Sequence, residues 1–211
     1  MLKRYLARQF ARPQGLVGTW LIAPWLDRIA GPSNRLALRQ MEIRPGDRVL
    51  EIGFGGGGLI AALLSTDATA VIGVDISREM VARATRRFAR QLGTGGLDLV
   101  TAPVEQLPLG DATIDAAVSV ASLYFWPDPA AALAELHRVI RPGGRLVLCF
   151  EPADELRKWP GHLFGFRLFE PSEVETLVTE AGFAISSVGT GYGRNPDRFL
   201  CLSAVRPDAN G

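Results

Sequence analysis

Residues 49–58, Val-Leu-Glu-Ile-Gly-Phe-Gly-Gly-Gly-Gly, read as a short strand that runs directly into a glycine-rich loop. Aliphatic residues favour the strand, and a turn signal at residues 44–47 precedes it. Because glycine has no Cβ, the loop can bend sharply and let a ligand approach its backbone. The apolar run at residues 59–64 then indicates a helix. This order predicts a nucleotide-binding edge of an α/β sheet.

Strand and helix patterns alternate after residue 40. Strands are predicted at residues 48–52, 70–75, 97–101, 114–120, 145–150, 183–188 and 199–205, and helices at 58–65, 77–92, 128–140 and 172–181. Repeated strand–helix units predict a mostly parallel, doubly wound α/β sheet. The last two strands are joined by a loop too short for a helix, so we expect them to pair antiparallel. Ligands bind such sheets at the carboxyl ends of strands, which selects residues 53–58, 75–76, 102–105 and 119–124.

Composition excludes several classes of function. The 211-residue chain is 47% hydrophobic with a formal net charge of +1, which argues against a general nucleic-acid binder. No apolar run is long enough for a stable membrane span, although the basic, apolar N-terminal segment leaves a membrane-surface contact as the less favoured interpretation. Cys149 and Cys201 lack metal-ligand spacing, so we expect buried free thiols, no metal site and a reducing, cytoplasmic location.

The glycine loop by itself fits two kinds of cofactor. Gly53, Gly55 and Gly58 match the G-x-G-x-x-G pattern of dinucleotide-binding folds. Glu51, Gly53, Gly55 and Gly57 also match an acidic-x-G-x-G-x-G pattern, typical of S-adenosylmethionine-dependent methyltransferases. With four consecutive glycines some match is nearly guaranteed, so the rest of the chain has to separate the two.

Asp75 ends the second predicted strand, where an acid about 20 residues after the loop can bind both hydroxyls of an adenosine ribose. Both cofactors carry that ribose, so Asp75 does not discriminate between them. Three later segments do, at residues 101–109, 114–118 and 138–147, the last with a Pro-Gly-Gly turn between a helix and a strand. Together with the loop they resemble the ubiquinone- and menaquinone-biosynthesis type of class I methyltransferase.

The resemblance covers roughly residues 39–205 and implies a Rossmann-like fold. Its seven strands would follow the order 3-2-1-4-5-7-6, with strand 7 antiparallel. We expect an N-terminal helical cap at residues 1–38, a methyltransferase core at 39–206 and a flexible tail at 207–211. S-adenosylmethionine would be the cofactor and S-adenosylhomocysteine the product.

The resemblance also implies which residues contact the cofactor. These are Glu51, Gly53, Gly55, Gly57, Asp75, Ile76, Val104, Glu105, Ser119 and Val120. The loop, Ser119 and Val120 would serve the methionine end and the ribose, Asp75 the ribose hydroxyls, and Ile76 and Val104 the adenine. One position departs from the family: Pro103 stands where an acidic residue or Asn commonly accepts a hydrogen bond from the adenine amino group, and Glu105, Gln106 or a water is the expected substitute.

The predicted substrate pocket rests on weaker patterns. Tyr124 and Trp126 follow the fourth strand and are interpreted as pocket residues, with core packing as the alternative. Arg167 is a candidate for binding a substrate carboxylate or phosphate, and equally for an ordinary ion pair. Trp20 lies in the predicted cap. Tyr124 and His162 are the candidate catalytic residues, His162 as a general base or simply a loop-stabilising side chain.

The predicted function is methyl transfer to a small, apolar or amphipathic metabolite by direct in-line displacement. Near-neutral charge and the lack of an added recognition module disfavour nucleic-acid or protein substrates. Two alternatives stay open: a non-catalytic S-adenosylmethionine-binding subunit, suggested by Pro103, and a nicotinamide-dependent oxidoreductase. The sequence specifies neither the acceptor atom nor the oligomeric state.

Overall fold

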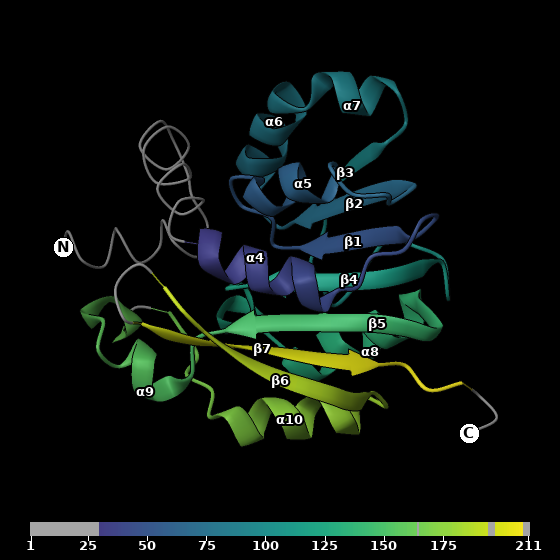
Figure 1. Cartoon of the computed structure of the whole chain (residues 1–211). Helices are drawn as coiled ribbons and strands as arrows, with labels where there is room; N and C mark the ends of the chain where they lie inside the picture. The colour runs from purple at the N-terminus through teal and green to yellow at the C-terminus, as the bar shows by residue number, and fades with distance from the viewer. Residues whose placement is uncertain (1–29, 164, 194–196, 209–211) are drawn as a thin grey trace.

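The computed structural model describes residues 30–163, 165–193 and 197–208, which form a seven-stranded sheet with helices on both faces (Figure 1). The strands are β1 (Arg48–Ile52), β2 (Ala70–Asp75), β3 (Leu97–Thr101), β4 (Ile114–Val120), β5 (Ile140–Phe150), β6 (Ala184–Tyr192) and β7 (Arg198–Val205). Their order is β3-β2-β1-β4-β5-β7-β6. β7 runs antiparallel to both β5 and β6, whereas β1 to β5 pair in parallel. The predicted fold class and strand order are therefore confirmed.

The helices divide between the two faces of the sheet. They are α4 (Gly31–Gln40), α5 (Gly58–Leu63), α6 (Arg78–Arg87), α7 (Ala89–Gly93), α8 (Pro129–Val139), α9 (Ala153–Leu156) and α10 (Pro171–Glu180), with short 3-10 turns at Leu123–Phe125 and Pro160–Leu163. Apolar side chains of α4, α5 and α6 bury one face, and those of α8 and α10 bury the other. Neighbouring strand residues alternate accordingly, as Val49 and Leu50 do on β1.

The predicted boundary between cap and core, after residue 38, falls inside α4. This helix packs over β4, β5, β6 and β7 on one face of the sheet (Figure 1). Ala37 and the C-cap residue Met41 are fully buried. Arg145 on β5 donates a hydrogen bond to the carbonyl of Met41 at 2.9 Å and forms an ion pair with Asp47. The rest of the predicted cap, including Trp20, lies outside the described residues.

The two cysteines meet across the antiparallel pair of β5 and β7. Cys149 lies opposite Cys201 in the strand register, their Cα atoms are 4.0 Å apart, and the structure joins them in a disulfide. The expectation of two free thiols is therefore wrong, because the register that opposes them arises only when distant strands pair. A reducing, cytoplasmic location consequently loses the support that free thiols provided.

Among the described residues, no helix has the length and apolar character needed to cross a bilayer. Likewise, no cluster of three or more His, Cys, Asp or Glu side chains suited to a metal ion occurs within that part of the chain.

Candidate active site at the carboxyl edge of the sheet

A cavity of about 620 Å³ opens where β1, β2, β4 and β5 end. Its wall includes the last residues of β1, β2 and β4 and residues that directly follow all four strands, as expected for a ligand site of a parallel sheet. The start of β7 reaches the same edge because that strand runs in the opposite direction. Ser33 and Asn34 of α4 close the cavity from one side.

Gly53 is the point where β1 turns into the loop. Its φ is +72°, and an added Cβ would lie 2.6 Å from Cβ of Ser122. A side chain at this position is therefore excluded by both backbone conformation and contact. Its N–H donates to the carbonyl of Val74 at 2.7 Å, which ties the loop to the end of β2.

The other loop glycines differ in what surrounds them. Gly55 has a φ of +51° and no atom within 4 Å of an added Cβ, so its backbone faces open space at the cavity. Gly57 has a φ of +80°, but its Cβ would meet Phe88 at 2.9 Å, and it is not on the cavity wall. Gly56 and Gly58 are on the wall; they fall within the range 53–58 selected by the strand-end rule but are not among the contacts that the resemblance implies.

Asp75 lies on the wall at the end of β2. Its Oδ2 accepts a hydrogen bond from the N–H of Gly55 at 2.9 Å, and Oδ1 accepts one from Ser77 at 2.8 Å. Burial raises the pKa of Asp75, and these two backbone hydrogen bonds act in the opposite direction. Each carboxylate oxygen keeps a lone pair for a further donor, so Asp75 has the capacity to receive two hydroxyls.

The adenine end of the predicted site contains Ile76, Val104 and Glu105, all on the cavity wall. Ile76 is 40% exposed, which leaves an apolar surface available to a flat ring. Of the two side chains proposed to replace the acceptor missing at Pro103, Glu105 lies on the wall, whereas Gln106 is exposed and away from it. Glu105 accepts a hydrogen bond from the N–H of Asp128 at 3.3 Å.

The predicted methionine end contains Ser122, which lies in the selected range 119–124 but is not among the contacts that the resemblance implies. Its hydroxyl lies 2.6 Å from that of Ser119, and it accepts a hydrogen bond from the indole N–H of Trp126 at 3.2 Å. Ser119 is buried behind the wall, so it positions Ser122 rather than facing the cavity. Glu51 and Val120 are both on the wall.

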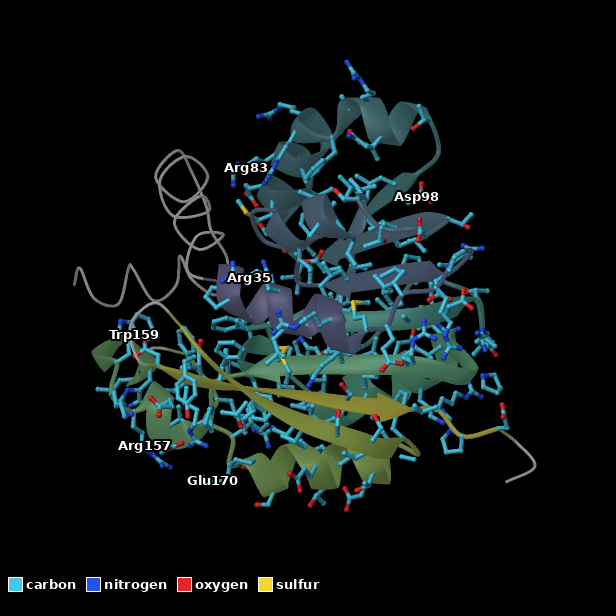
Figure 2. All side chains as sticks on the ribbon, viewed as in Figure 1. Arg35, Arg83, Asp98, Arg157, Trp159 and Glu170 are labelled. Carbon is cyan, nitrogen blue, oxygen red and sulfur yellow. A yellow bond between two sulfur atoms is a disulfide. The ribbon has the colours of Figure 1, made fainter. Side chains whose placement is uncertain are left out.

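Aromatic rings line the opposite end of the cavity. Phe125 and Phe166 have ring centroids 4.6 Å apart, Trp159 lies 5.1 Å from Phe166, and Tyr124 lies 5.7 Å from Phe166. All four rings and Trp126 belong to the cavity wall. Trp159 marks this end of the molecule in Figure 2.

Tyr124 also carries the main polar contact at the aromatic end. Its hydroxyl accepts a hydrogen bond from the backbone N–H of Glu151 and lies 3.3 Å from Oε2 of the same residue. Burial and the negative charge of Glu151 raise the pKa of Tyr124 well above its ordinary value, so the ring stays neutral. Glu151 follows β5 directly, and extending the strand-end rule to β5 finds it.

The structure does not bring His162 and Arg167 to the cavity. Nδ1 of His162 lies 2.6 Å from the carbonyl of Trp159, a contact within its own turn. The guanidinium of Arg167 lies 4.7 Å from the ring centre of Phe169 and 3.5 Å from Glu173, away from the wall. Their predicted roles therefore gain no geometric support, whereas Tyr124 and Trp126 lie where a substrate pocket was expected.

Comparison with known proteins agrees with this geometry. Residues 50–148 match a family model described as a methyltransferase domain, Methyltransf_11. An O-methyltransferase of Pyrenophora dematioidea is 29% identical over 156 residues, which cover 70% of this chain and 58% of that protein. The ubiquinone/menaquinone biosynthesis C-methyltransferase UbiE of Geotalea daltonii is 28% identical over 117 residues, or 54% of this chain and 50% of that protein. The chain thus spans little more than half the length of these relatives.

Solved structures share the fold at low sequence identity. A complex of the Haloferax volcanii Trm112 methyltransferase activator with a putative methyltransferase matches with a TM-score of 0.77 and 20% identity, covering 88% of this chain and 93% of the other. The N-methyltransferase NodS of Bradyrhizobium japonicum, bound to S-adenosylhomocysteine, matches with a TM-score of 0.70 and 20% identity, covering 83% and 86%.

Proposed function

We propose that this chain, whose residues 50–148 belong to the methyltransferase domain family, transfers a methyl group from S-adenosylmethionine to a small apolar or amphipathic metabolite. One observation carries the proposal. A single cavity at the carboxyl edge of the sheet joins a glycine loop and Asp75 at one end to a set of aromatic rings at the other. A nucleotide and a second, less polar molecule can therefore lie side by side in it.

The residues present fit the cofactor. Asp75 has lone pairs for the two ribose hydroxyls, and the backbone at Gly55 leaves room for the sugar. Ile76 offers an apolar surface to the adenine, and Glu105 is the nearest substitute for the acceptor that Pro103 lacks. Glu51 and the hydroxyl of Ser122 are available to the methionine portion.

When bound, S-adenosylmethionine supplies an electrophilic methyl group on a sulfonium. The chain contributes position: the loop and strand ends hold one reactant while the aromatic rings hold the other. Such alignment can supply about 7–11 kcal/mol of the barrier. The faces of aromatic rings also attract cations, which favours a sulfonium near Tyr124 and Trp126.

Calorimetric titration of the full chain with S-adenosylmethionine, S-adenosylhomocysteine and NAD tests the cofactor. We expect the first two to bind with Kd values on the order of micromolar, about −8 kcal/mol, and NAD not to bind. Asp75→Asn should weaken both by about tenfold or more, because the amide replaces one acceptor oxygen with a donor. Asp98→Asn is the matched control: Asp98 is exposed on β3, on the far side of the molecule from Trp159 (Figure 2), and should leave binding unchanged.

Binding of NAD instead would favour the oxidoreductase alternative. Binding of the sulfur nucleotides without transfer of a labelled methyl group to any of a broad panel of acceptors would favour the non-catalytic subunit. Equal affinity of Asp75→Asn and the original chain would contradict the assignment of the ribose site.

A further inference from the structure

The aromatic end of the cavity contains a carboxylate that the proposed cofactor does not use. Glu151 follows β5, whereas the residues proposed for the adenosine follow β1, β2 and β3, and β4 lies between the two sets in the sheet. Within the described part of the chain, Tyr124 is the one side chain that hydrogen-bonds to Glu151, and it does so through Oε2. Oε1 is left for a ligand.

Among the described residues of the cavity wall, negative charges strongly outnumber positive ones. Six carboxylates lie on its described wall, namely Glu51, Asp75, Glu105, Glu151, Glu155 and Asp197. Lys158 is the one cation among the described wall residues, and it is paired with Glu155 at 2.6 Å. An acceptor carrying a carboxylate or phosphate would enter against like charge, whereas a cation would find compensation.

The rings beside Glu151 suit the same kind of ligand. Tyr124, Phe125, Phe166 and Trp159 contact one another and face the cavity. Aromatic faces next to a carboxylate are the combination that binds organic ammonium groups. The rings would hold an apolar body attached to that group.

From these features, and resting on the function proposed above, we infer that the methyl acceptor is an amine attached to an aromatic or apolar group. Glu151 would bind it as the ammonium and then take its proton. Tyr124 acts as a positioning residue, since its hydroxyl fixes both the backbone and the carboxylate of Glu151.

The reaction balances without another reagent. One proton passes from the ammonium to Oε1 of Glu151, which frees the nitrogen lone pair. The nitrogen then forms a bond to the methyl carbon as the sulfur–carbon bond breaks, and that electron pair returns to sulfur as the neutral thioether. The product is a methylammonium, and the proton on Glu151 is released to water.

Burial and the nearby charges of Asp197 and Glu155 raise the pKa of Glu151, while the hydrogen bond from Tyr124 acts in the opposite direction. A carboxylate of raised pKa is a better proton acceptor near neutral pH. A hydroxyl acceptor would instead develop negative charge beside Glu151, with Asp197 and Glu155 nearby, and these carboxylates oppose it.

The test compares three head groups on the same body: 2-phenylethylamine, 2-phenylethanol and 3-phenylpropanoate, together with the corresponding naphthyl series. Affinities are measured by calorimetry on the full chain saturated with S-adenosylhomocysteine. We expect the amine to bind at least about tenfold tighter than the alcohol, a difference of about 1.4 kcal/mol, and the carboxylate not to bind. Glu151→Gln should lose that preference while keeping its affinity for S-adenosylhomocysteine.

Glu180→Gln is the control, because Glu180 is an exposed residue of α10 away from the cavity. Labelled methyl transfer to the amine should fall about 10²–10⁴-fold in Glu151→Gln, and the acid limb of its pH profile should disappear. Tyr124→Phe should shift that limb and retain more activity than Glu151→Gln.

Two results separate failure of this inference from failure of the proposed function. If S-adenosylhomocysteine binds but the three head groups do not differ, or if Glu151→Gln keeps the preference for the amine, the amine assignment is wrong and methyl transfer stands. If S-adenosylhomocysteine does not bind to folded protein, the proposed function fails and this inference fails with it.

Discussion

The pKa values of carboxylates shift in opposite directions at the two ends of the sheet. At the carboxyl end, burial raises the pKa of Asp75 and of Glu151, and both side chains face the cavity. Toward the amino end, the hydrogen bond from Arg138 lowers the pKa of Glu135. The pKa of Asp115 is also lowered: burial acts to raise it, but hydrogen bonds from Arg141 and the backbone of Arg48 outweigh that effect.

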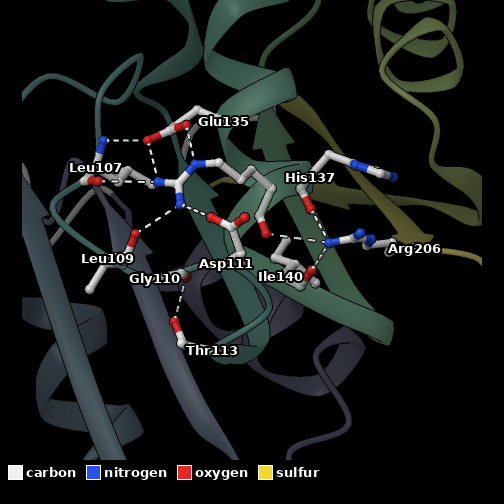
Figure 3. A network of polar contacts seen from close by, with 10 residues as sticks. Leu107, Leu109, Gly110, Asp111, Thr113, Glu135, His137, Ile140 and Arg206 are labelled. Carbon is white, nitrogen blue, oxygen red and sulfur yellow. Dashed lines mark hydrogen bonds and ion pairs between the residues drawn. The ribbon is translucent and has the colours of Figure 1, made fainter.

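Figure 3 shows how fully partnered the amino end is. The guanidinium of Arg138 donates to Glu135 at 2.7 Å, Asp111 at 2.5 Å and the carbonyl of Leu109 at 2.9 Å. Arg206 donates to the carbonyls of His137 and Ile140, both at 2.6 Å. These contacts tie the loop before β4, the end of α8 and the end of β7 together.

This difference in partners indicates which carboxylates stabilise the fold and which are available to a ligand. A carboxylate that meets an arginine within the fold is already satisfied and mainly holds elements in place. A desolvated carboxylate that faces a cavity without a cation beside it is poised to receive one from outside. Asp154 follows the same rule: it lies off the cavity wall, pairs with Arg198 at 2.7 Å, and its pKa is lowered, although burial opposes this.

Of the variants considered, Gly53→Ala, at the carboxyl end of the sheet, should destabilise the fold most. We expect a loss of about 2–5 kcal/mol in the free energy of unfolding, from left-handed backbone strain and from the contact with Ser122. Urea unfolding measures it. Gly95→Ala is the control, because Gly95 has a φ of +76° but no atom within 4 Å of an added Cβ, so it reports strain alone. Equal losses in the two variants would mean that Ser122 moves aside.

Arg138→Met should remove the hydrogen bonds that connect the elements at the amino end of the sheet. Removing the guanidinium leaves the carbonyls of Leu107 and Leu109 without this donor and leaves Glu135 with the N–H of Leu107 alone, and we expect a loss of about 1–3 kcal/mol in unfolding free energy. The Kd for S-adenosylhomocysteine should stay the same. A weakened Kd in the folded variant would show that the two ends are coupled and would contradict the separation drawn above.

Gly55→Ala should mainly weaken cofactor affinity and have a smaller effect on stability, the opposite of Arg138→Met. Its Cβ has free space, so the loss of stability should be limited to about 1–2 kcal/mol of left-handed strain. Because the methyl group points into the cavity where the sugar is expected, the affinity for S-adenosylhomocysteine should fall by about tenfold. Calorimetry and urea unfolding on the same sample separate the two effects, and unchanged affinity would remove Gly55 from the predicted cofactor contacts.

Glu135→Gln and Glu151→Gln should alter the pH dependence of stability in opposite directions, with the smallest effects. The lowered pKa of Glu135 stabilises the fold above pH 4.5, and that contribution is lost as the pH falls through the folded-state value. The raised pKa of Glu151 favours the fold at acid pH, and that contribution is lost as the pH rises from 4.5 through the folded-state value.

Unfolding free energies measured from pH 3.5 to 7.5 test this opposition. Glu135→Gln should flatten the acid-side loss of stability, and Glu151→Gln should be at least as stable as the original chain at neutral pH. Changes of the same sign in both variants would mean that the two carboxylates do not differ as described.

Much of the fold followed from local patterns. The strand run at 49–52 and the alternation of periods predicted seven strands, and the family resemblance supplied their order, which the structure confirms. The predicted turn at 142–144 is not a separate turn: these residues lie within β5, where the register with β4 shifts. Ser77, the first residue of the helix predicted at 77–92, is the N-cap of α6 and accepts a hydrogen bond from the N–H of Met80 at 3.4 Å. These features depend on residues close in sequence, so hydrophobic period and turn chemistry suffice to find them.

Two helices differ from their predicted form, one because of a tertiary contact and one because of a neighbouring proline. The helix predicted at residues 77–92 is interrupted at Phe88, whose ring turns inward and packs on Gly57. α10 takes its capping box from Glu170 and Glu173 rather than from the Ser-x-x-Glu that starts at Ser172. Pro171 explains this shift, because proline suits the first position of a helix.

By itself, the sequence determined the class of sheet, the edge at which the cavity opens, and the positions of the glycine loop and Asp75 along that edge. Only the tertiary structure decided that Glu151 contacts Tyr124, that His162 and Arg167 lie off the cavity wall, and that Cys149 meets Cys201. The physical reason is that period and spacing specify which strand end a residue follows. The direction of a side chain and the charge of its neighbours depend on packing between segments far apart in the chain.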